Sequence, residues 1–147
     1  MILSDPAASH DLGARLAAVV RTGDVIALSG PLGAGKTSIA RGLLAALGLA
    51  GEAPSPSFAI VQPYDVPEVR LPVLHVDLYR IVDPSEIDEL GLDEARQDMA
   101  LVVEWPERAG PRAWRDALRL TLAIADDGTR MLTAAAPPGW EDRWSRI

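Results

Sequence analysis

The segment Gly30-Pro31-Leu32-Gly33-Ala34-Gly35-Lys36-Thr37 has the residue types and spacing that bind phosphate groups. It fits the Walker A pattern, in which a glycine and four variable residues precede Gly-Lys-Thr. The glycines let backbone N–H groups turn inward around anionic oxygens, and a helix that starts at Lys36 adds its unpaired N–H groups. We therefore expect a nucleoside triphosphate to be bound by Gly30, Leu32, Gly33, Ala34, Gly35, Lys36, Thr37 and Ser38.

The expected catalytic residues are Lys36, Asp77 and Glu104. Lys36, the one lysine of the chain, would reach the β and γ phosphates, and the Thr37 hydroxyl would ligate Mg²⁺. Phosphoryl transfer also needs a carboxylate beside the metal and a group that orients the nucleophile. Asp77 and Glu104 each follow an apolar run, and α/β sheets gather ligands at the carboxyl ends of their strands. The pattern leaves open which carboxylate touches Mg²⁺ and which positions water.

Other residues have ordinary structural explanations. His75 stands between two apolar residues, which favours a half-buried histidine with satisfied hydrogen bonds over an acid–base group. Ser55-Pro56-Ser57 is either a nucleotide-sensing segment or an ordinary connector. Trp140 and Trp144 are four residues apart on a predicted helix, which is typical of packing residues.

Hydrophobic periodicity and turn signals predict the elements that position these residues. We expect helices at residues 6–20, 36–47, 83–91 and 140–147, and strands at 25–29, 58–62, 71–77, 100–104, 118–124 and 130–135. The turn Asp126-Asp127-Gly128 joins the last two strands into a hairpin. The pattern indicates an α/β fold like that of P-loop NTPases: a mostly parallel central sheet flanked by helices, with an antiparallel C-terminal hairpin extension.

The bulk composition narrows the function. A chain of 147 residues with 48% hydrophobic content fits a single domain over residues 1–147. The net charge of −7 disfavours direct tRNA or DNA binding. Of the 21 acidic residues, 18 follow residue 50, so a basic partner would meet this later part. Cysteine is absent, which excludes disulfides and thiolate zinc sites. The apolar runs are too short for a membrane span, and we expect a cytoplasmic protein that does not associate with membranes.

Several classes of nucleotide-binding protein are disfavoured. A GTPase reads guanine with an Asn/Thr-Lys-x-Asp element, but the chain has no asparagine and no lysine besides Lys36. ATP is therefore the expected nucleotide. The Leu-Ser-Gly-Gly signature of transporter ATPases is also absent, and no arginine-rich lid of the nucleotide-kinase kind stands between residues 80 and 120.

Five motifs occur in one order, and together they resemble the TsaE (YjeE) family. They are Gly33-Ala34-Gly35-Lys36-Thr37, Ser55-Pro56-Ser57-Phe58, His75-Val76-Asp77-Leu78-Tyr79-Arg80, Asp83-Pro84 with Glu89-Leu90-Gly91, and Val103-Glu104-Trp105-Pro106-Glu107. The resemblance implies a Mg²⁺-dependent ATPase that works with TsaB and TsaD to make N6-threonylcarbamoyladenosine in tRNA. It also implies that hydrolysis is slow without the partners, and that tRNA is met only through the complex.

The same resemblance implies roles for single residues. Thr37 and Glu104 would sit at Mg²⁺, Asp77 would support hydrolysis, and residues near Asp5 and Ser9 would lie on the adenine side.

The chain departs from the family pattern at two positions. Ser57 replaces the usual threonine and keeps its hydroxyl. Pro31 stands where the family usually has aspartate, and it removes a carboxylate and a backbone N–H. We expect Pro31 to change loop stiffness or a partner contact rather than phosphate binding.

Two alternative functions use the same loop. A small-molecule kinase would pass the phosphate to a bound hydroxyl, but the residues after the loop leave limited room for an acceptor pocket and a lid. An ATP-sensing module would bind the nucleotide and barely hydrolyse it.

Overall fold

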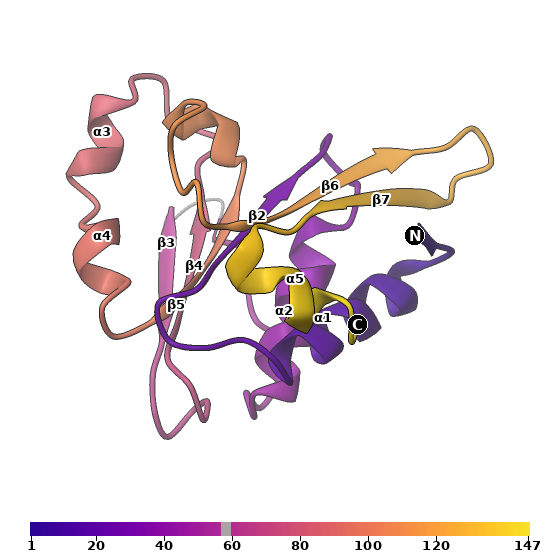
Figure 1. The fold of residues 1–147 in the computed structure, drawn as a ribbon, viewed down its shortest axis with the longest axis horizontal. Helices are drawn as coiled ribbons and strands as arrows, with labels where there is room; N and C mark the ends of the chain where they lie inside the picture. Colours follow the sequence, from indigo (N-terminus) through magenta and orange to yellow (C-terminus); the bar gives the residue numbers. More distant parts are fainter. Residues whose placement is uncertain (57–59) are drawn as a thin grey trace.

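The fold is built on one seven-stranded sheet (Figure 1). The computed structural model describes residues 1–56 and 60–147. The strands are β1 Ile2–Leu3, β2 Val25–Ser29, β3 Val61–Tyr64, β4 Val73–Asp77, β5 Ala100–Glu104, β6 Leu118–Ile124 and β7 Arg130–Ala135. The helices are α1 Pro6–Ala17, α2 Lys36–Ala46, α3 Ser85–Asp88, α4 Leu92–Ala95 and α5 Pro138–Trp144, with a 3₁₀ turn at Pro106–Ala109. None of the helices in this described part of the chain is long and apolar enough to cross a membrane.

The sheet has the strand order β1-β7-β6-β2-β5-β4-β3. Its four central strands, β6, β2, β5 and β4, are mutually parallel. The outer strands pair antiparallel, and β6 with β7 forms the hairpin. This arrangement confirms the predicted α/β fold with a parallel centre and an antiparallel extension. Because β2 lies between β5 and β6, the loop after β2 emerges at the centre of the sheet.

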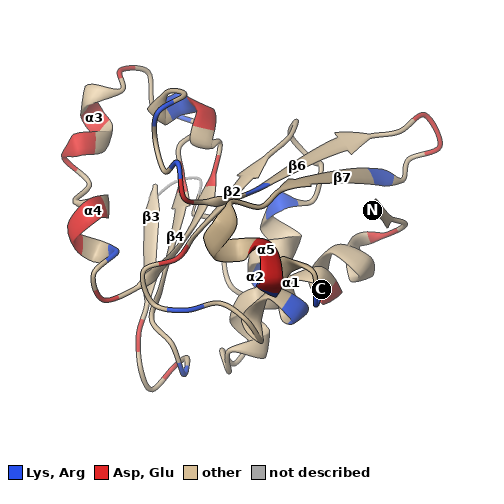
Figure 2. Cartoon of the chain, in the orientation of Figure 1, with Lys and Arg blue, Asp and Glu red and all other residues tan. Residues whose placement is uncertain are grey.

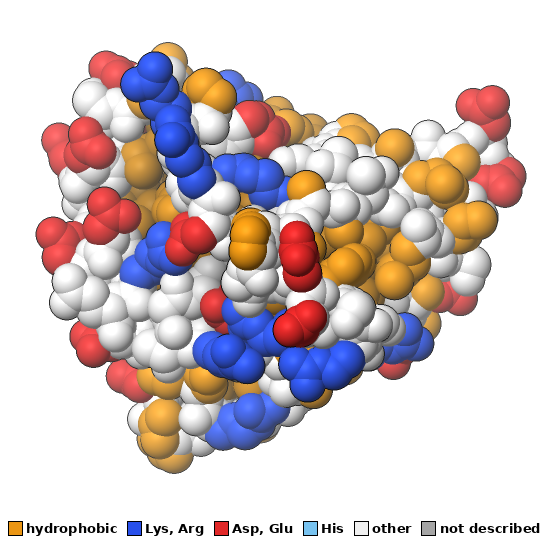
Figure 3. All heavy atoms as spheres, viewed as in Figure 1, with side chains coloured by type: hydrophobic (Ala, Val, Ile, Leu, Met, Phe, Trp, Pro, Cys, Tyr) orange, Lys and Arg blue, Asp and Glu red, His pale blue; other side chains and the backbone are white. Residues whose placement is uncertain are grey.

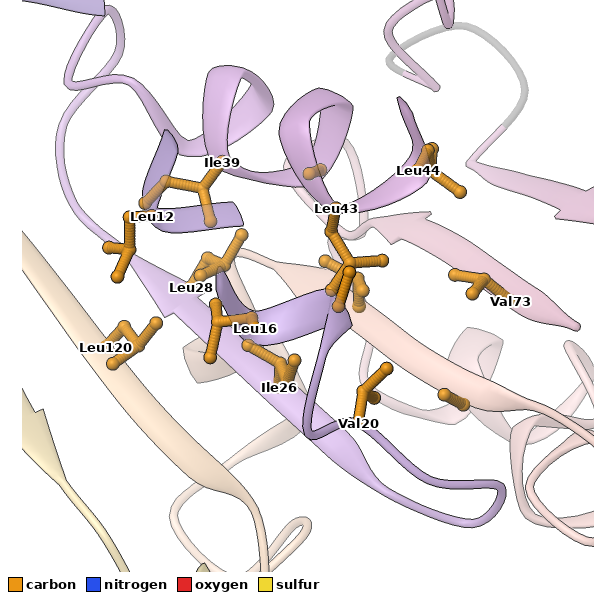
Figure 4. Close-up of a cluster of buried hydrophobic side chains, with 14 of the residues drawn as sticks. Leu12, Leu16, Val20, Ile26, Leu28, Ile39, Leu43, Leu44, Val73 and Leu120 are labelled. Atoms are coloured by element: carbon orange, nitrogen blue, oxygen red, sulfur yellow. The ribbon is translucent and has the colours of Figure 1, made fainter. Parts of the chain in front are cut away.

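Apolar side chains fill both faces of the sheet. Successive strand residues point to opposite faces, so Ile26 and Leu28 of β2 pack toward α1 and α2. Val25 and Ala27 pack on the other face, which the segments around α4 and the 3₁₀ turn cover. Figure 4 shows Leu12 and Leu16 of α1 meeting side chains of α2 and the sheet. Burying each such leucine contributes about 1.5–3 kcal/mol, so this layer holds α2 firmly on the sheet.

Helices α1 and α2 approach each other closely at two glycines. A Cβ at Gly13 would lie 2.0 Å from the Ile39 carbonyl oxygen, and one at Gly42 would lie 1.9 Å from the His10 carbonyl oxygen. Both obstacles are backbone atoms, which cannot rotate away as a side chain can. The two glycines therefore set the distance between α1 and α2.

We expect Gly13→Ala to destabilise the fold by about 3 kcal/mol, because overpacking against backbone forces the helices apart. Thermal unfolding should show a midpoint lower by about 10 °C. The matched control is Gly139→Ala in α5, where an added Cβ has no heavy atom within 4 Å. A Gly13→Ala protein that unfolds at the same temperature as this control would show that the helices can separate freely.

The C-terminal helix α5 is fastened to the start of β2. The Arg143 guanidinium pairs with both carboxylate oxygens of Asp24, at 2.6 and 3.1 Å, and it lies 3.8 Å from the centre of the Trp140 ring. Trp140 is buried in the core, and Trp144 packs against it. The prediction that both tryptophans are packing residues is confirmed.

The predicted acidic helix at 83–91 is present but shorter than expected, because α3 covers only Ser85–Asp88. A second single-turn helix, α4, follows at Leu92–Ala95 and was not expected. Gly91 separates them with a φ of 66°, a left-handed conformation that glycine adopts without steric cost. Acidic side chains lie on both turns and along this edge of the molecule (Figures 2 and 3).

The sheet edges differ from prediction. Of the strand expected at 58–62, Phe58 and Ala59 lie outside the described residues, and β3 runs from Val61 to Tyr64. The short strand β1 was not expected, because two residues carry no readable periodicity. It pairs with β7 and brings the N-terminal segment beside the hairpin.

Candidate phosphate-binding site

The loop between β2 and α2 adopts a conformation that requires glycine. Gly30 has a φ of 149°, and a Cβ there would lie 2.7 Å from the Leu122 carbonyl oxygen of β6. Gly35 has a φ of 104° directly before α2, with the Ser9 hydroxyl 3.2 Å from where a Cβ would stand. Larger residues would be strained or would clash at both positions. The glycine spacing seen in the sequence is therefore a property of this backbone.

Lys36, the first residue of α2, is almost completely buried at 5% exposure. Its ammonium donates to the carbonyl oxygens of Gly30 and of Pro31, the latter at 3.0 Å. It also lies 4.1 Å from the centre of the Trp105 ring, within the range of a cation–π interaction. The cation is thus held at the mouth of the loop.

The charges around Lys36 oppose each other. Burial lowers the pKa of its ammonium, whereas the carboxylates of Glu104, Glu107 and Asp77 act to raise it. Three acidic groups therefore face one lysine. The carboxylates outnumber the lysine, so they would repel bound phosphates. A further cation would offset that repulsion.

The two predicted carboxylates lie side by side. Asp77 ends β4 and Glu104 ends β5, and they are Cα partners across the parallel pair. The Thr37 hydroxyl donates to the Glu104 carboxylate, with its two oxygens at 3.1 and 3.2 Å. Asp77 accepts a hydrogen bond from the Tyr79 backbone N–H at 2.9 Å. Strand order thus brings together residues that are far apart in sequence.

His75 makes a contact that its sequence position did not suggest. Its Nε2 lies 2.7 Å from Glu104 Oε2, and the side chain has 0% exposure. The expectation of a half-buried histidine is wrong, because β4 has neighbours on both edges and a covered face on each side. The Nδ1 atom has no hydrogen-bond partner among the residues that the structure describes.

Two cavities flank the loop. One, of about 250 Å³, is lined by Leu32, Gly33, Ala34, Gly35, Lys36, Thr37, Ser38, Asp77, Glu104 and Trp105. The other, of about 210 Å³, shares Gly33, Ala34, Gly35 and Ser38, and adds Leu3, Ser4, Asp5, Pro6, Ser9, Gly128 and Arg130. Gly30 directly follows β2 and lines neither cavity. The expected adenine-side residues, Asp5 and Ser9, thus face the second cavity.

A larger cavity of about 560 Å³ lies elsewhere, between α3, α4 and residues 109–116. None of the predicted site residues lines it. Its walls carry both acidic and arginine side chains and lack a glycine-rich turn. The predicted site residues that line a cavity therefore lie at the two smaller ones.

The donor set fits Mg²⁺. Mg²⁺ prefers oxygen ligands, and at nucleotide sites it is held by one or two protein groups together with phosphates and water. The Thr37 hydroxyl and the Glu104 carboxylate provide such a pair. In the described part of the chain, no three His, Cys, Asp or Glu side chains form an all-protein metal site. The pair is therefore suited to a metal that arrives with a nucleotide.

Three residues at the site were not assigned to it from the sequence. His75 needed knowledge that β4 and β5 are neighbours. Arg130 comes from the hairpin and donates to the Gly33 carbonyl at 3.0 Å, a contact across 97 positions. Trp105 did have a signal, since it directly follows Glu104. Its φ of 60° is uncommon for a residue with a side chain and turns the ring over Lys36.

A glycine-rich turn between a central parallel strand and a helix, with carboxylates at the ends of neighbouring strands, is the arrangement of P-loop proteins in the α/β class. The chain matches the family model described as "Threonylcarbamoyl adenosine biosynthesis protein TsaE" over residues 3–132. It therefore belongs to the TsaE family, and with it to tRNA threonylcarbamoyladenosine biosynthesis.

Individual relatives agree with this membership. The tRNA threonylcarbamoyladenosine biosynthesis protein TsaE of Streptomyces coelicolor is 39% identical over 141 residues, covering 92% of this chain and 93% of the relative. The TsaE of Bacillus subtilis is 36% identical over 121 residues, covering 82% and 74%. The crystal structure of Bacillus subtilis YdiB superposes with a TM-score of 0.83 at 27% identity, covering 99% of this chain and 90% of YdiB.

Proposed function

We propose that the chain is an ATPase subunit that binds Mg²⁺ and ATP, hydrolyses ATP slowly, and supports homologues of TsaB and TsaD in making N6-threonylcarbamoyladenosine in tRNA. The observation that carries this proposal is the meeting of Lys36, Thr37, Asp77 and Glu104 around one cavity beside the glycine-rich loop. These four side chains cover the roles that phosphoryl transfer to water requires.

Each side chain has a distinct role in the proposal. Lys36 binds the β and γ phosphates through its ammonium, and the loop N–H groups bind the remaining oxygens. Thr37 and Glu104 hold Mg²⁺, which when bound neutralises charge that develops on the phosphates. Asp77 orients the attacking water, because Glu104 is the carboxylate already joined to Thr37.

The acidic surface supports the role of a subunit that does not grip tRNA itself. Acids on α3 and α4 repel phosphate backbones, so the RNA contacts would belong to partner proteins. We accordingly expect partners, rather than RNA, to stimulate hydrolysis.

The test follows the labelled γ-phosphate of ATP with the chain alone, with a metabolite extract, and with purified TsaB and TsaD homologues. Free phosphate that rises with the partners is the expected result. Label on a small molecule would instead identify a kinase. Binding without release of phosphate in every mixture would identify an ATP sensor.

The cavity lined by Asp5, Ser9 and Arg130 is the proposed adenine side. We expect Arg130→Ala to weaken ATP binding by about tenfold, since stacking of an arginine on a ring contributes about 0.5–2 kcal/mol. Affinity for inorganic tripolyphosphate should stay unchanged, because that ligand leaves this cavity empty. Arg146→Ala, at an exposed position on the C-terminal side, is the control. An equal loss of affinity for ATP and for tripolyphosphate would show that Arg130 contacts the phosphates instead of the adenine side.

A further inference from the structure

The Glu104 carboxylate is held from two sides. On one side the Thr37 hydroxyl donates to it, and on the other His75 Nε2 lies 2.7 Å from Oε2. All three residues are on the α2 face of the sheet, because His75 alternates with Leu74 and Val76 of the opposite core layer. With both oxygens engaged, the plane of the carboxylate is defined before any ligand binds.

The hydrogen-bonding pattern identifies the tautomer of His75. A carboxylate can only accept hydrogen bonds, so Nε2 must carry the hydrogen and donate it to Glu104. The opposite ring nitrogen, Nδ1, is buried and has no partner in the described part of the chain.

We propose that His75 is a positioning residue that orients Glu104 for the metal of the nucleotide complex. This inference rests on the proposed function, in which Glu104 and Thr37 hold Mg²⁺. Carboxylates that bind metals are themselves oriented by hydrogen bonds from neighbouring groups, and loss of such a partner typically lowers metal affinity by about 10–100-fold. His75 is the group that supplies this bond from behind Glu104, away from the phosphate cavity.

Two amide substitutions at position 75 test whether the side chain must be long enough to donate a hydrogen bond to Glu104, or need only be polar. In His75→Gln, the side-chain amide extends about as far as Nε2 and can still donate to Glu104. In His75→Asn, the amide ends near the position of Nδ1 and falls short. His75→Leu removes the donor and keeps a similar volume. Thermal unfolding of each variant reports folding separately from metal binding.

The readout is Mn²⁺ binding to the protein loaded with a non-hydrolysable ATP analogue, measured by electron paramagnetic resonance. We expect Asn and Leu at position 75 to raise the Mn²⁺ dissociation constant by about 10–100-fold, and Gln to stay within about threefold of wild type. Nucleotide affinity in excess chelator should be the same for all the proteins, because Lys36 and the loop are untouched.

The outcomes separate this inference from the proposed function. If wild type and the Gln and Asn variants bind Mn²⁺ equally, His75 does not position Glu104, although the ATPase proposal survives. If His75→Gln binds Mn²⁺ as weakly as His75→Asn while both variants fold, the length of the donor side chain does not matter. The inference is then also overturned. Wild-type protein that binds no Mn²⁺ with the nucleotide would overturn both proposals.

The tautomer can be read directly in the wild-type protein. The chain has two histidines, His10 and His75, so a His10→Gln variant assigns their ring nitrogens in a ¹H–¹⁵N spectrum. The expected result is a His75 ring with a hydrogen on Nε2, the atom that lies 2.7 Å from Glu104 Oε2. A ring with a hydrogen on Nδ1 and none on Nε2 would have no donor for Glu104, and it would overturn the inference without any change at position 75.

Discussion

Replacing Lys36 by methionine should weaken ATP binding by at least about 100-fold. A hydrogen bond to a charged group contributes about 1.5–3 kcal/mol, and the ammonium is expected to make two with the β and γ phosphates. Their loss costs about 3 kcal/mol or more, which corresponds to roughly two orders of magnitude in affinity. Isothermal titration calorimetry measures this directly. Methionine has an unbranched side chain of similar length, and it lacks the ammonium that lies over the Trp105 ring.

Stability separates this effect from unfolding. Burial lowers the pKa of Lys36, which means that the fold does not favour its charge in the absence of phosphates. The methionine variant removes this charge but also loses the hydrogen bonds of the ammonium to the Gly30 and Pro31 carbonyls, so we expect its heat stability to stay close to that of wild type. Arg21→Met, which removes a positive charge from an exposed position, should leave both affinity and stability unchanged. Wild-type affinity in the Lys36→Met protein would refute the assignment of the loop.

The elements that position the loop were predictable from local sequence. The strands expected at 25–29 and 100–104 match β2 and β5 residue for residue. Buried parallel strands read as short continuous apolar runs, and here Gly23-Asp24 and the Walker A glycines delimit the first of them. Helix α2 was likewise expected from Lys36 onward, because its apolar residues recur at helical spacing.

The contacts inside the site were not predictable in the same way. His75 and Glu104 are 29 positions apart, and they meet because β4 and β5 are neighbours. Strand order is a property of the whole chain and leaves no mark on local periodicity. The same holds for Arg143 and Asp24, which are 119 positions apart and fasten α5 to the start of β2.

The sequence left Asp77 and Glu104 as equal candidates for the metal, and the geometry now predicts different behaviour for the two. Glu104→Gln should lower the affinity of the nucleotide complex for Mn²⁺ by about tenfold or more, because the neutral amide loses the charge that holds the cation. Asp77→Asn should leave that affinity within about threefold. Glu104 differs from Asp77 in its direct contact with the Thr37 hydroxyl.

Turnover should fall in both variants, for different reasons. Asp77→Asn removes the group that orients water, and such a loss typically costs about 10²–10⁴-fold in rate. Raising the Mg²⁺ concentration should not restore it. Glu104→Gln should regain part of its activity at high Mg²⁺, since its defect lies in metal occupancy. Phosphate release in the presence of the partner proteins, measured across a Mg²⁺ titration, separates the two cases.

The isosteric amides matter because both carboxylates are buried, at 6% exposure for Asp77 and 3% for Glu104. Alanine would leave a cavity and unpair the Thr37 hydroxyl or the Tyr79 N–H, which mixes a folding defect with a chemical one. Asparagine and glutamine keep an acceptor oxygen for these donors and remove the charge. A Mg²⁺ titration that rescues Asp77→Asn but not Glu104→Gln would reverse the two assignments, and Asp77 would then be the metal ligand.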